Sequence, residues 1–235
     1  MATDYRRLTE NLSCFYDFTS KVVFFVGAGG RQLLDPSIKT KRLIAIDRDV
    51  EALRELKTKL AANGTQHSVD VVGANFEDVT SFGDVVYFEF CLHEMVDPQK
   101  TLAHARTVAP DIVVFDHLLD SDWVFYAVEG DKVRRHADAM KRFGVRRRET
   151  FRTEQRFRDY AELLAKVTVQ GAVTIQRAQH FAGATNIAIP MSISAAKCYS
   201  RGLRHFSWGV LAVGGPFALL GAYFAKEIRS FAIGS

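Results

Sequence analysis

The stretch Val22-Val23-Phe24-Phe25-Val26-Gly27-Ala28-Gly29-Gly30, followed by Leu43-Ile44-Ala45-Ile46-Asp47, decides the fold. Each of the two stretches contains an apolar run that is typical of a buried strand. The first run enters a glycine turn, and the second run ends on an acid. Glycines let the backbone approach a ligand closely, and an acid at the next strand end can accept ribose hydroxyl protons. The two stretches together indicate a sheet that presents a nucleotide-like ligand site at its strand ends.

Strands and helices alternate along most of the chain. The expected strands are 22–26, 43–46, 67–72, 85–90 and 112–115, with a late antiparallel pair at 173–178 and 187–194. The expected helices are 4–20, one beginning near Arg31, 49–62, 98–108, 129–143 and 154–166. This order predicts an α/β, Rossmann-like parallel sheet with right-handed crossovers and an antiparallel final strand pair. Ligands of such sheets bind at the carboxyl ends of the strands.

Length and composition favour one cytosolic domain over residues 1–200. The chain has 235 residues, a net charge of +4 and three widely spaced cysteines, so no disulfide framework is expected. The N-terminus has no apolar core of a signal peptide. The basic run Arg146-Arg147-Arg148 continues with Arg152, Arg156 and Arg158 and has acids interspersed, which favours a solvated helical face. Nucleic acid is therefore not an expected partner.

The segment 201–235 has a different composition and is expected to form an apolar helical tail. No charged residue occurs between 206 and 225, and basic residues flank this run on both sides. Such a run predicts attachment to the cytoplasmic face of a membrane, as a span or as a shallow hairpin bent at Gly214-Gly215-Pro216. Burial within protein, as an oligomer interface or a pocket lid, is the alternative, so a homo-oligomer stays open.

Further motifs follow the later strands. Gly73-Ala74-Asn75-Phe76-Glu77-Asp78-Val79 comes after the third strand, and the fourth strand runs into Cys91-Leu92-His93-Glu94-Met95-Val96-Asp97-Pro98. With the glycine turn and Asp47, these ordered features resemble a class I S-adenosylmethionine (SAM) dependent methyltransferase. The chain departs from that family at Phe25, where an acid is usual, and at Arg31, where a third glycine is usual.

The resemblance implies a role for each of these residues. Gly27, Ala28, Gly29, Gly30, Asp47 and Arg48 would hold SAM, while Asp49 is better placed to cap the next helix. Asn75 and Phe76 would hold the adenine, with Glu77 or Asp78 as alternatives to Asn75. His93 and Glu94 would face the acceptor, with His93 as a base because its unperturbed pKa of about 6.5 is near neutral. Cys91 would lie beside the cofactor, although a buried core position is its alternative.

The expected function is methyl transfer from SAM to a small, lipophilic acceptor. An NAD(P)-dependent oxidoreductase is the enzyme alternative, and Gln32 weakens it because the dinucleotide motif needs a glycine or alanine there. A non-catalytic SAM-binding module is the other alternative. No metal is assigned. Asp116-His117 and His93-Glu94 at neighbouring strand ends leave a divalent cation as the minority interpretation.

Overall fold

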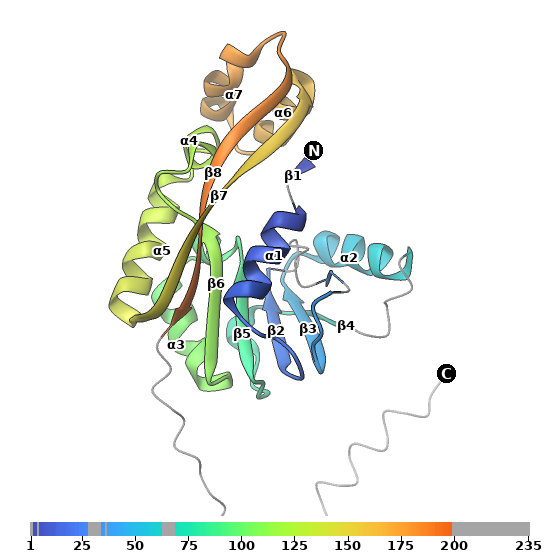
Figure 1. The fold of residues 1–235 in the computed structure, drawn as a ribbon, viewed down its shortest axis with the longest axis vertical. Helices are drawn as coiled ribbons and strands as arrows, with labels where there is room; N and C mark the ends of the chain where they lie inside the picture. Colours follow the sequence, from blue (N-terminus) through green and yellow to red (C-terminus); the bar gives the residue numbers. More distant parts are fainter. Residues whose placement is uncertain (1, 4, 28–33, 36, 63–68, 199–235) are drawn as a thin grey trace, which may run out of the picture. The chain divides into compact units, whose positions relative to one another are not determined.

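The computed structural model describes residues 2–3, 5–27, 34–35, 37–62 and 69–198, all within one unit that spans 1–202 (Figure 1). The strands are β1 (Ala2–Thr3), β2 (Val22–Val26), β3 (Arg42–Asp47), β4 (Val69–Gly73), β5 (Val85–Glu89), β6 (Asp111–His117), β7 (Val145–Asp159) and β8 (Thr185–Cys198). The helices are α1 (Tyr5–Phe15), α2 (Val50–Ala62), α3 (Pro98–Val108), α4 (Asp122–Tyr126), α5 (Gly130–Phe143), α6 (Tyr160–Thr168) and α7 (Ala172–Ala178), with the short 3-10 helices η2 (Phe76–Asp78), η3 (Leu92–Glu94) and η4 (Gln179–Phe181).

The described strands form a single sheet in the order β1-β7-β8-β6-β5-β2-β3-β4. The five strands from β4 to β6 are parallel, and β8 pairs antiparallel with both β6 and β7. This arrangement confirms the predicted Rossmann-like parallel sheet with an antiparallel final strand pair. Figure 1 shows β7 and β8 running beyond the parallel strands, with α4, α6 and α7 around their far end.

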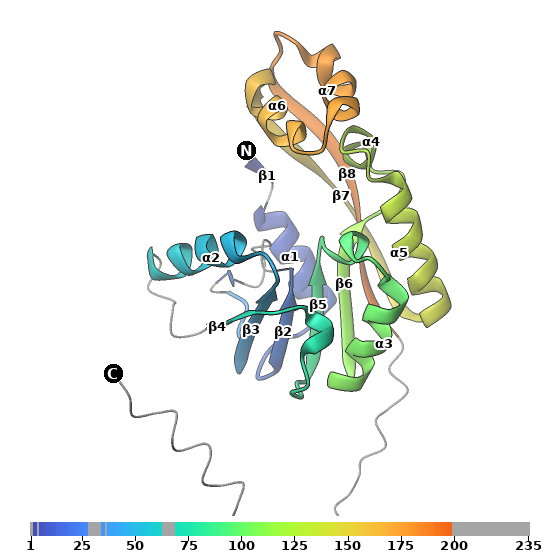
Figure 2. The ribbon, with the colours of Figure 1, turned by 180° about the vertical axis from the view of Figure 1, so that it is seen from behind.

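Alternation along the central strand explains how helices come to cover both faces of the sheet. Val23 and Phe25 of β2 pack into one core with residues of α1 and α2, whereas Phe24 and Val26 pack into a second core with residues of α3 and α5. Successive strand side chains point to opposite faces, so a continuous apolar run serves two cores at once. Figures 1 and 2, viewed from opposite sides, show α1 and α3 on opposite faces of the sheet.

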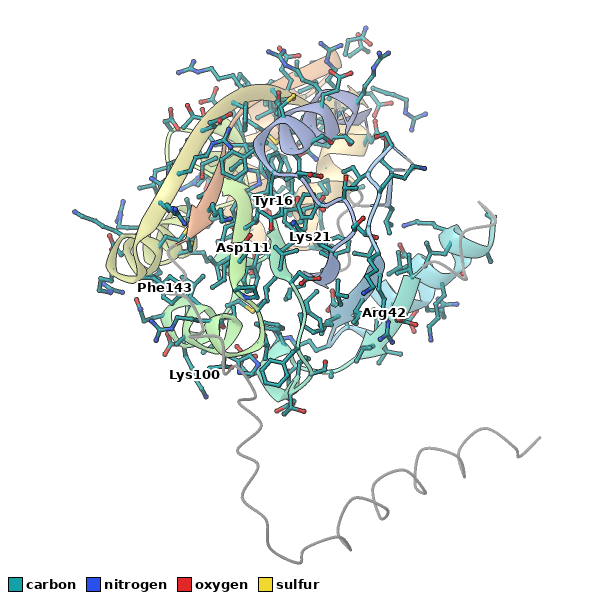
Figure 3. The ribbon with its side chains drawn as sticks, turned by 60° about the horizontal axis from the view of Figure 1, so that its bottom comes forward. Tyr16, Lys21, Arg42, Lys100, Asp111 and Phe143 are labelled. Carbon is teal, nitrogen blue, oxygen red and sulfur yellow. The ribbon has the colours of Figure 1, made fainter. Side chains whose placement is uncertain are left out.

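The two edges of the parallel strands have different roles. At the amino edge, the Tyr16 hydroxyl donates to Asp111 Oδ2 over 2.6 Å, and Lys197 Nζ lies 2.7 Å from the same oxygen (Figure 3). These contacts tie the end of α1 to the start of β6 and to β8. At the carboxyl edge, the chain order reverses between β2 and β5, because β3 and β4 continue to one side and β6 to the other. Ligands of open α/β sheets bind at such a switch point.

The prediction of a helix over 154–166 was wrong for its first part. The arginine-rich segment belongs to β7, where Thr153, Gln155 and Phe157 are buried and their neighbours are more exposed. Buried side chains therefore recur at every second residue, as in a strand. Polar side chains occupy two of the three buried positions, so hydrophobicity alone did not show the alternation. The arginines are solvated as expected, but they project from a strand.

The prediction of a strand over 173–178 was also wrong, because this segment is α7. Thr174 and Ala178 are its buried residues, and their spacing is helical. Gly171, with φ of +107°, precedes the helix and turns the chain back after α6. The β-branched residues Val173, Thr174 and Ile175 favour a strand locally, and packing of α7 against α6 outweighs that preference. The antiparallel partner of β8 is therefore β7.

Two predicted features lie outside the described residues. The first is the segment after β2, which comprises the turn residues Ala28, Gly29 and Gly30 and the helix expected near Arg31. The second is the tail at 201–235. Within the part of the chain that the structure describes, no helix is both long and apolar enough to cross a bilayer.

Candidate functional site

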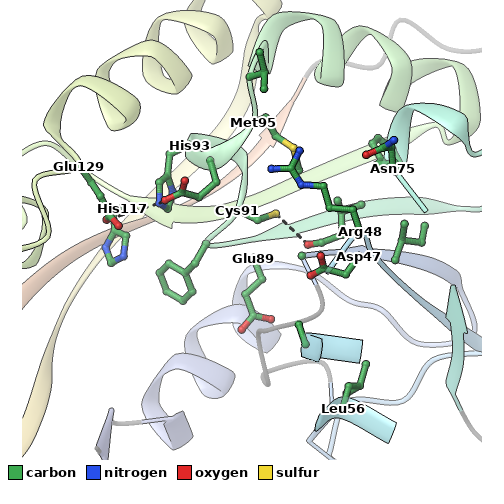
Figure 4. A pocket seen from close by; sticks show the side chains of 18 of the residues that line it. Asp47, Arg48, Leu56, Asn75, Glu89, Cys91, His93, Met95, His117 and Glu129 are labelled. Carbon is green, nitrogen blue, oxygen red and sulfur yellow. Dashed lines mark hydrogen bonds and ion pairs between the residues drawn. The ribbon is translucent and has the colours of Figure 1, made fainter. Parts of the chain in front are cut away.

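One cavity of about 960 Å³ lies at the carboxyl ends of the parallel strands (Figure 4). The predicted site residues that line it are Gly27, Asp47, Arg48, Asn75, Phe76, Cys91, His93 and Glu94. The structure thus brings together every predicted site residue that it describes. These residues follow β2, β3, β4 and β5, and parallel strands bring their carboxyl ends to one edge.

Gly27 and Cys91 interlock at the switch point between β2 and β5. Gly27 has φ of +78°, and a Cβ atom there would lie 2.5 Å from the Cys91 Cβ. The Cys91 thiol donates to the carbonyl oxygen of Val26 over 3.1 Å. Burial and the negative charge of Asp116 raise the pKa of the Cys91 thiol well above its usual value. Cys91 therefore contributes packing and cavity wall rather than a reactive thiolate.

Asp47 ends β3 beside the cavity, as predicted. Its Oδ1 accepts a hydrogen bond from the Asp49 backbone N–H over 2.9 Å, and its carbonyl oxygen accepts from Ala74 N–H over 3.0 Å. The cap of α2 is Asp49, whose Oδ1 accepts from Glu51 N–H at 2.9 Å. Helix capping is thus supplied by Asp49. Asp47 stays at the strand end, where an acid can meet a ribose.

The loop after β4 presents several polar groups to the cavity. Asn75 Nδ2 donates to Asp78 Oδ2 over 3.3 Å, whereas Glu77 accepts from the Thr101 hydroxyl over 2.6 Å. The bond to Thr101 ties Glu77 to α3. Phe76 is only 3% exposed and packs edge-on against Phe88. Asn75 and Asp78 are therefore the side chains of this loop best placed to bond a ligand.

Glu89 is a buried acid that the sequence interpretation did not assign. It ends β5, is 2% exposed and lines the cavity. Val26 pairs with Phe88, so Glu89, the last residue of β5, lies beside the Gly27 turn. Phe25, the position where the family that the sequence resembles usually has an acid, is fully buried in the core. Glu89, at the end of β5, therefore supplies an acid close to the Gly27 turn, where β2 has Phe25 in place of an acid.

At the other end of the cavity, η3 places His93 against the end of β6. His93 Nδ1 lies 2.6 Å from Asp116 Oδ1, and the His93 backbone N–H donates to Asp116 Oδ2 over 3.2 Å. The other ring nitrogen, Nε2, lies 3.4 Å from Glu94 Oε1 and 3.8 Å from Glu129 Oε2. Asp116 is fully buried, so this pair fixes the orientation of the imidazole.

The carboxylates around His93 change its titration. Burial alone would lower the pKa of His93, but the charge and hydrogen bond of Asp116, with Glu94 and Glu129, outweigh burial and raise that pKa to about 10. The unperturbed value assumed from sequence does not apply, and His93 carries a proton at neutral pH. Although burial opposes ionisation of Asp116, His93 holds the pKa of that carboxyl well below its usual value.

Two acids face His93 in different environments. The pKa of Glu94 is lowered to about 2, first by the hydrogen bond from His93 and then by Lys132, whose Nζ lies 2.8 and 2.7 Å from the two Glu94 oxygens. Burial acts in the opposite direction and is outweighed. Glu129 is 5% exposed, and burial raises its pKa. Gln170 Nε2 donates to Glu129 Oε1 over 3.0 Å, while Glu129 Oε2 accepts no hydrogen bond.

Two further histidines pack near His93 and stay neutral. Burial lowers the pKa of His117 to about 4 and also lowers the pKa of His136. Their ring centroids lie 5.8 and 6.3 Å from that of His93. His93 is therefore the charged member of this histidine cluster at pH 7.

Several of these residues could not be assigned from sequence. Asp116 and His117 were noted because they end a strand, and Glu89 ends β5 in the same way and could have been found by that rule. Glu129 precedes α5, Lys132 lies within α5, and Gln170 follows α6. No local pattern marks these three residues. The fold alone brings Glu129 and Gln170 to the cavity and Lys132 to Glu94.

Comparisons with known proteins agree with this geometry. No known family profile and no curated protein matches the sequence. Among solved structures, the chain resembles the YcgJ protein of Bacillus subtilis, with 10% identity, a TM-score of 0.61 and coverage of 84% of this chain and 100% of the other. The chain also resembles a proposed methyltransferase from Bacillus halodurans, with 13% identity, a TM-score of 0.57 and coverage of 84% of this chain and 98% of the other. For a proposed sarcosine dimethylglycine methyltransferase from Galdieria sulphuraria, the identity is 11%, the TM-score is 0.52, and the match covers 82% of this chain and 84% of the other.

At these identities the comparisons establish architecture. The chain has the fold of the class I SAM-dependent methyltransferases, as the sequence motifs predicted. The same fold occurs in the [4+2]-cyclase SpnF, at 12% identity and a TM-score of 0.52. Function therefore has to be argued from the site.

Proposed function

We propose that the protein transfers a methyl group from SAM to a small-molecule acceptor. The observation that carries this proposal is the set of residues that line one cavity. Its switch-point end holds the Gly27 turn and the Asp47 carboxylate, and its other end holds the buried His93–Asp116 pair. A cofactor held at the first end would point its reactive group towards the second.

The residues of the switch-point end fit SAM. Gly27 packs against Cys91 without a side chain of its own, and this close contact holds the backbone of the turn at the cavity wall. Asp47 would accept both ribose hydroxyls, and Asn75 would bond the adenine. Glu89 would pair with the ammonium of the methionine part, in place of the acid that Phe25 replaces. When bound, SAM supplies an electrophilic methyl group, so the protein has mainly to position the acceptor.

The acceptor end combines apolar and polar walls. Trp123 and Met191 line it together with the polar side chains of Glu129, Gln155 and Gln170. Glu129 is deeply buried, and a buried carboxylate favours a ligand that carries a hydrogen-bond donor or a positive charge. These walls suit a small molecule with an apolar body and one polar group. The lipophilic character expected from the tail stays a prediction.

Calorimetric titration tests the cofactor assignment. SAM and S-adenosylhomocysteine should bind with one-to-one stoichiometry, and NAD(P)H should not bind. Binding of NAD(P)H alone would favour the oxidoreductase alternative. Incubation with methyl-labelled SAM and a metabolite extract then separates an enzyme from a non-catalytic SAM-binding module, since only an enzyme labels a product.

Two acids should make separable contributions to SAM affinity. Asp47→Ala and Glu89→Gln should each weaken SAM binding by about 1–3 kcal/mol, because each removes a charged hydrogen-bond acceptor. Methylthioadenosine has the ribose but lacks the amino-acid part. Its affinity should therefore fall in Asp47→Ala and stay unchanged in Glu89→Gln.

The matched control for both variants is Glu51→Gln, an exposed acid on α2. Equal losses of methylthioadenosine affinity in both variants would contradict the assignment of Glu89 to the ammonium. Wild-type SAM affinity in a folded Asp47→Ala protein would remove Asp47 from the site.

We expect the segment 201–235 to attach the domain at 1–200 to a membrane through 206–225. Fractionation of the full chain and of a version ending at Arg201 tests this expectation. The full chain should need detergent for extraction, and the shortened chain should not. If both remain in the supernatant, the tail is buried in protein, and the argument for a lipophilic acceptor weakens.

A further inference from the structure

We propose that His93, Glu94 and Glu129 bind a divalent transition-metal ion at the acceptor end of the cavity. One ligand atom from each of the three residues lies within 4.8 Å of the others. The sequence interpretation left a metal as the minority alternative and did not consider Glu129. The inference concerns metal binding itself and holds whether or not the protein transfers methyl groups.

The imidazole of His93 is oriented as metal-ligating imidazoles are. Its Nδ1 is held by the buried Asp116 carboxylate at 2.6 Å, and this leaves Nε2 towards the two glutamates. A bound ion would replace the proton that Nε2 carries in the metal-free protein, and that proton would be released to solvent. A carboxylate behind the non-ligating nitrogen fixes the tautomer and increases ligand basicity in metal sites. The contact of the His93 backbone N–H with Asp116 at 3.2 Å further restricts movement of this pair.

Glu129 supplies the strongest indication that a cation belongs here. The residue is 5% exposed and lines the cavity, and Gln170 donates to its Oε1. Its Oε2 accepts no hydrogen bond and lies 3.8 Å from His93 Nε2. Leaving a buried carboxylate oxygen without a donor is costly, and coordination of a cation would remove that cost.

Glu94 can complete the site without losing its present partner. Lys132 contacts both of its oxygens, but an ionised carboxylate has about four lone-pair positions, so one oxygen can still coordinate an ion. Its side chain is 45% exposed, which gives it room to adjust. Three protein ligands would leave open positions for water or an acceptor oxygen, as catalytic metal sites do.

The donor set indicates which ions would bind. Imidazole suits zinc, iron, nickel and copper, whereas sites made only of oxygen suit magnesium and calcium. One imidazole and two carboxylates therefore favour Zn²⁺, which takes both kinds of ligand, over Mg²⁺. Mn²⁺, which suits carboxylate and water ligands, is the second ion to test. The two carboxylates would balance the charge of the ion, and Asp116 would stay behind His93.

Calorimetric titration of the full-length, chelator-stripped protein with ZnCl₂ and MnCl₂ tests the proposal. We expect one Zn²⁺ or Mn²⁺ per chain, with Mg²⁺ binding more weakly. Glu94→Gln and Glu129→Gln should each lower the affinity at least about tenfold, since each removes a charged ligand. Asp116→Asn should lower it by about 10–100-fold, as loss of a partner behind a ligating histidine typically does.

Glu51→Gln is again the matched control, because its carboxylate is exposed on α2 away from the cavity. Glu129→Gln could unfold because the residue is buried. Thermal unfolding with and without Zn²⁺ therefore accompanies the titration. At the same Zn²⁺ concentration, the Tm of the wild type should rise more than that of Glu94→Gln, whose side chain is half-exposed.

Two results would overturn the metal site. One is a folded wild type that binds neither Zn²⁺ nor Mn²⁺. The other is binding with wild-type affinity in both Glu94→Gln and Glu129→Gln, which would place the ion elsewhere. SAM titration of the same preparations distinguishes these failures from failure of the proposed methyl transfer, because SAM binding depends on the opposite end of the cavity.

Discussion

Gly27→Ala is expected to lower the free energy of unfolding by about 2–5 kcal/mol and to abolish measurable SAM binding. A left-handed backbone costs a non-glycine residue roughly 1–2 kcal/mol, and overpacking a tight contact costs roughly 1–3 kcal/mol more. Both penalties apply, since Gly27 has φ of +78° and its new Cβ would lie 2.5 Å from the Cys91 Cβ. Urea unfolding and calorimetry measure the two effects.

Gly183→Ala is the matched control for this change. Gly183 has φ of +79° and no atom within 4 Å of the added Cβ, so the control carries the backbone penalty alone. The double variant Gly27→Ala, Cys91→Gly should recover part of the lost stability, because it removes the atom in the way. Equal losses in Gly27→Ala and Gly183→Ala would show that the contact with Cys91 is unimportant.

His93→Gln should reduce methyl transfer by about 10²–10⁴-fold while SAM affinity changes by less than about threefold. The estimate is the usual contribution of a positioned acid–base group, which here would act as a proton donor because His93 is protonated at neutral pH. Steady-state turnover measures the first quantity and calorimetry the second. His180→Gln, an exposed histidine on η4, is the control. Full activity in a folded His93→Gln protein would remove His93 from the acceptor site.

The pH dependence adds a second measurement on His93. Because its pKa is raised to about 10, His93 stays protonated from pH 6 to 8 in the metal-free protein and loses the proton as the pH rises through about 10. The kcat/KM profile of chelator-treated enzyme should show no step near pH 6.5 that belongs to His93. A step at that pH that disappears in His93→Gln would contradict the raised pKa.

Much of the architecture follows from local patterns. The run Val22–Val26 predicts a buried strand, since every position is apolar, and the spacing of Leu53, Leu56 and Leu60 predicts α2. Asp97 and Pro98 mark the start of α3, where Asp97 accepts from Lys100 N–H. These features depend on neighbours within a few residues, and such dependence is what a sequence displays directly.

The predicted strand over 187–194 is confirmed as β8, but β7 and α7 could not be placed in the same way. The buried face of β7 includes Thr153 and Gln155, which have no hydrophobic signature, and α7 is rich in β-branched residues. Packing of β7 against β8 and of α7 against α6 selects the observed structures, and the partners of β7 are distant in sequence. Local preference is a weak predictor where such contacts dominate.

The sequence by itself determined that Gly27, Asp47, Asn75 and His93 meet at one edge, because each follows a strand and parallel strands end together. Only the tertiary structure decided what surrounds His93. Glu129 is brought to it from another segment of the chain and lies buried, with Oε2 3.8 Å from His93 Nε2. The raised pKa of His93 follows from the carboxylates that the fold places around it, and the proposed metal site follows from the positions of the glutamate oxygens.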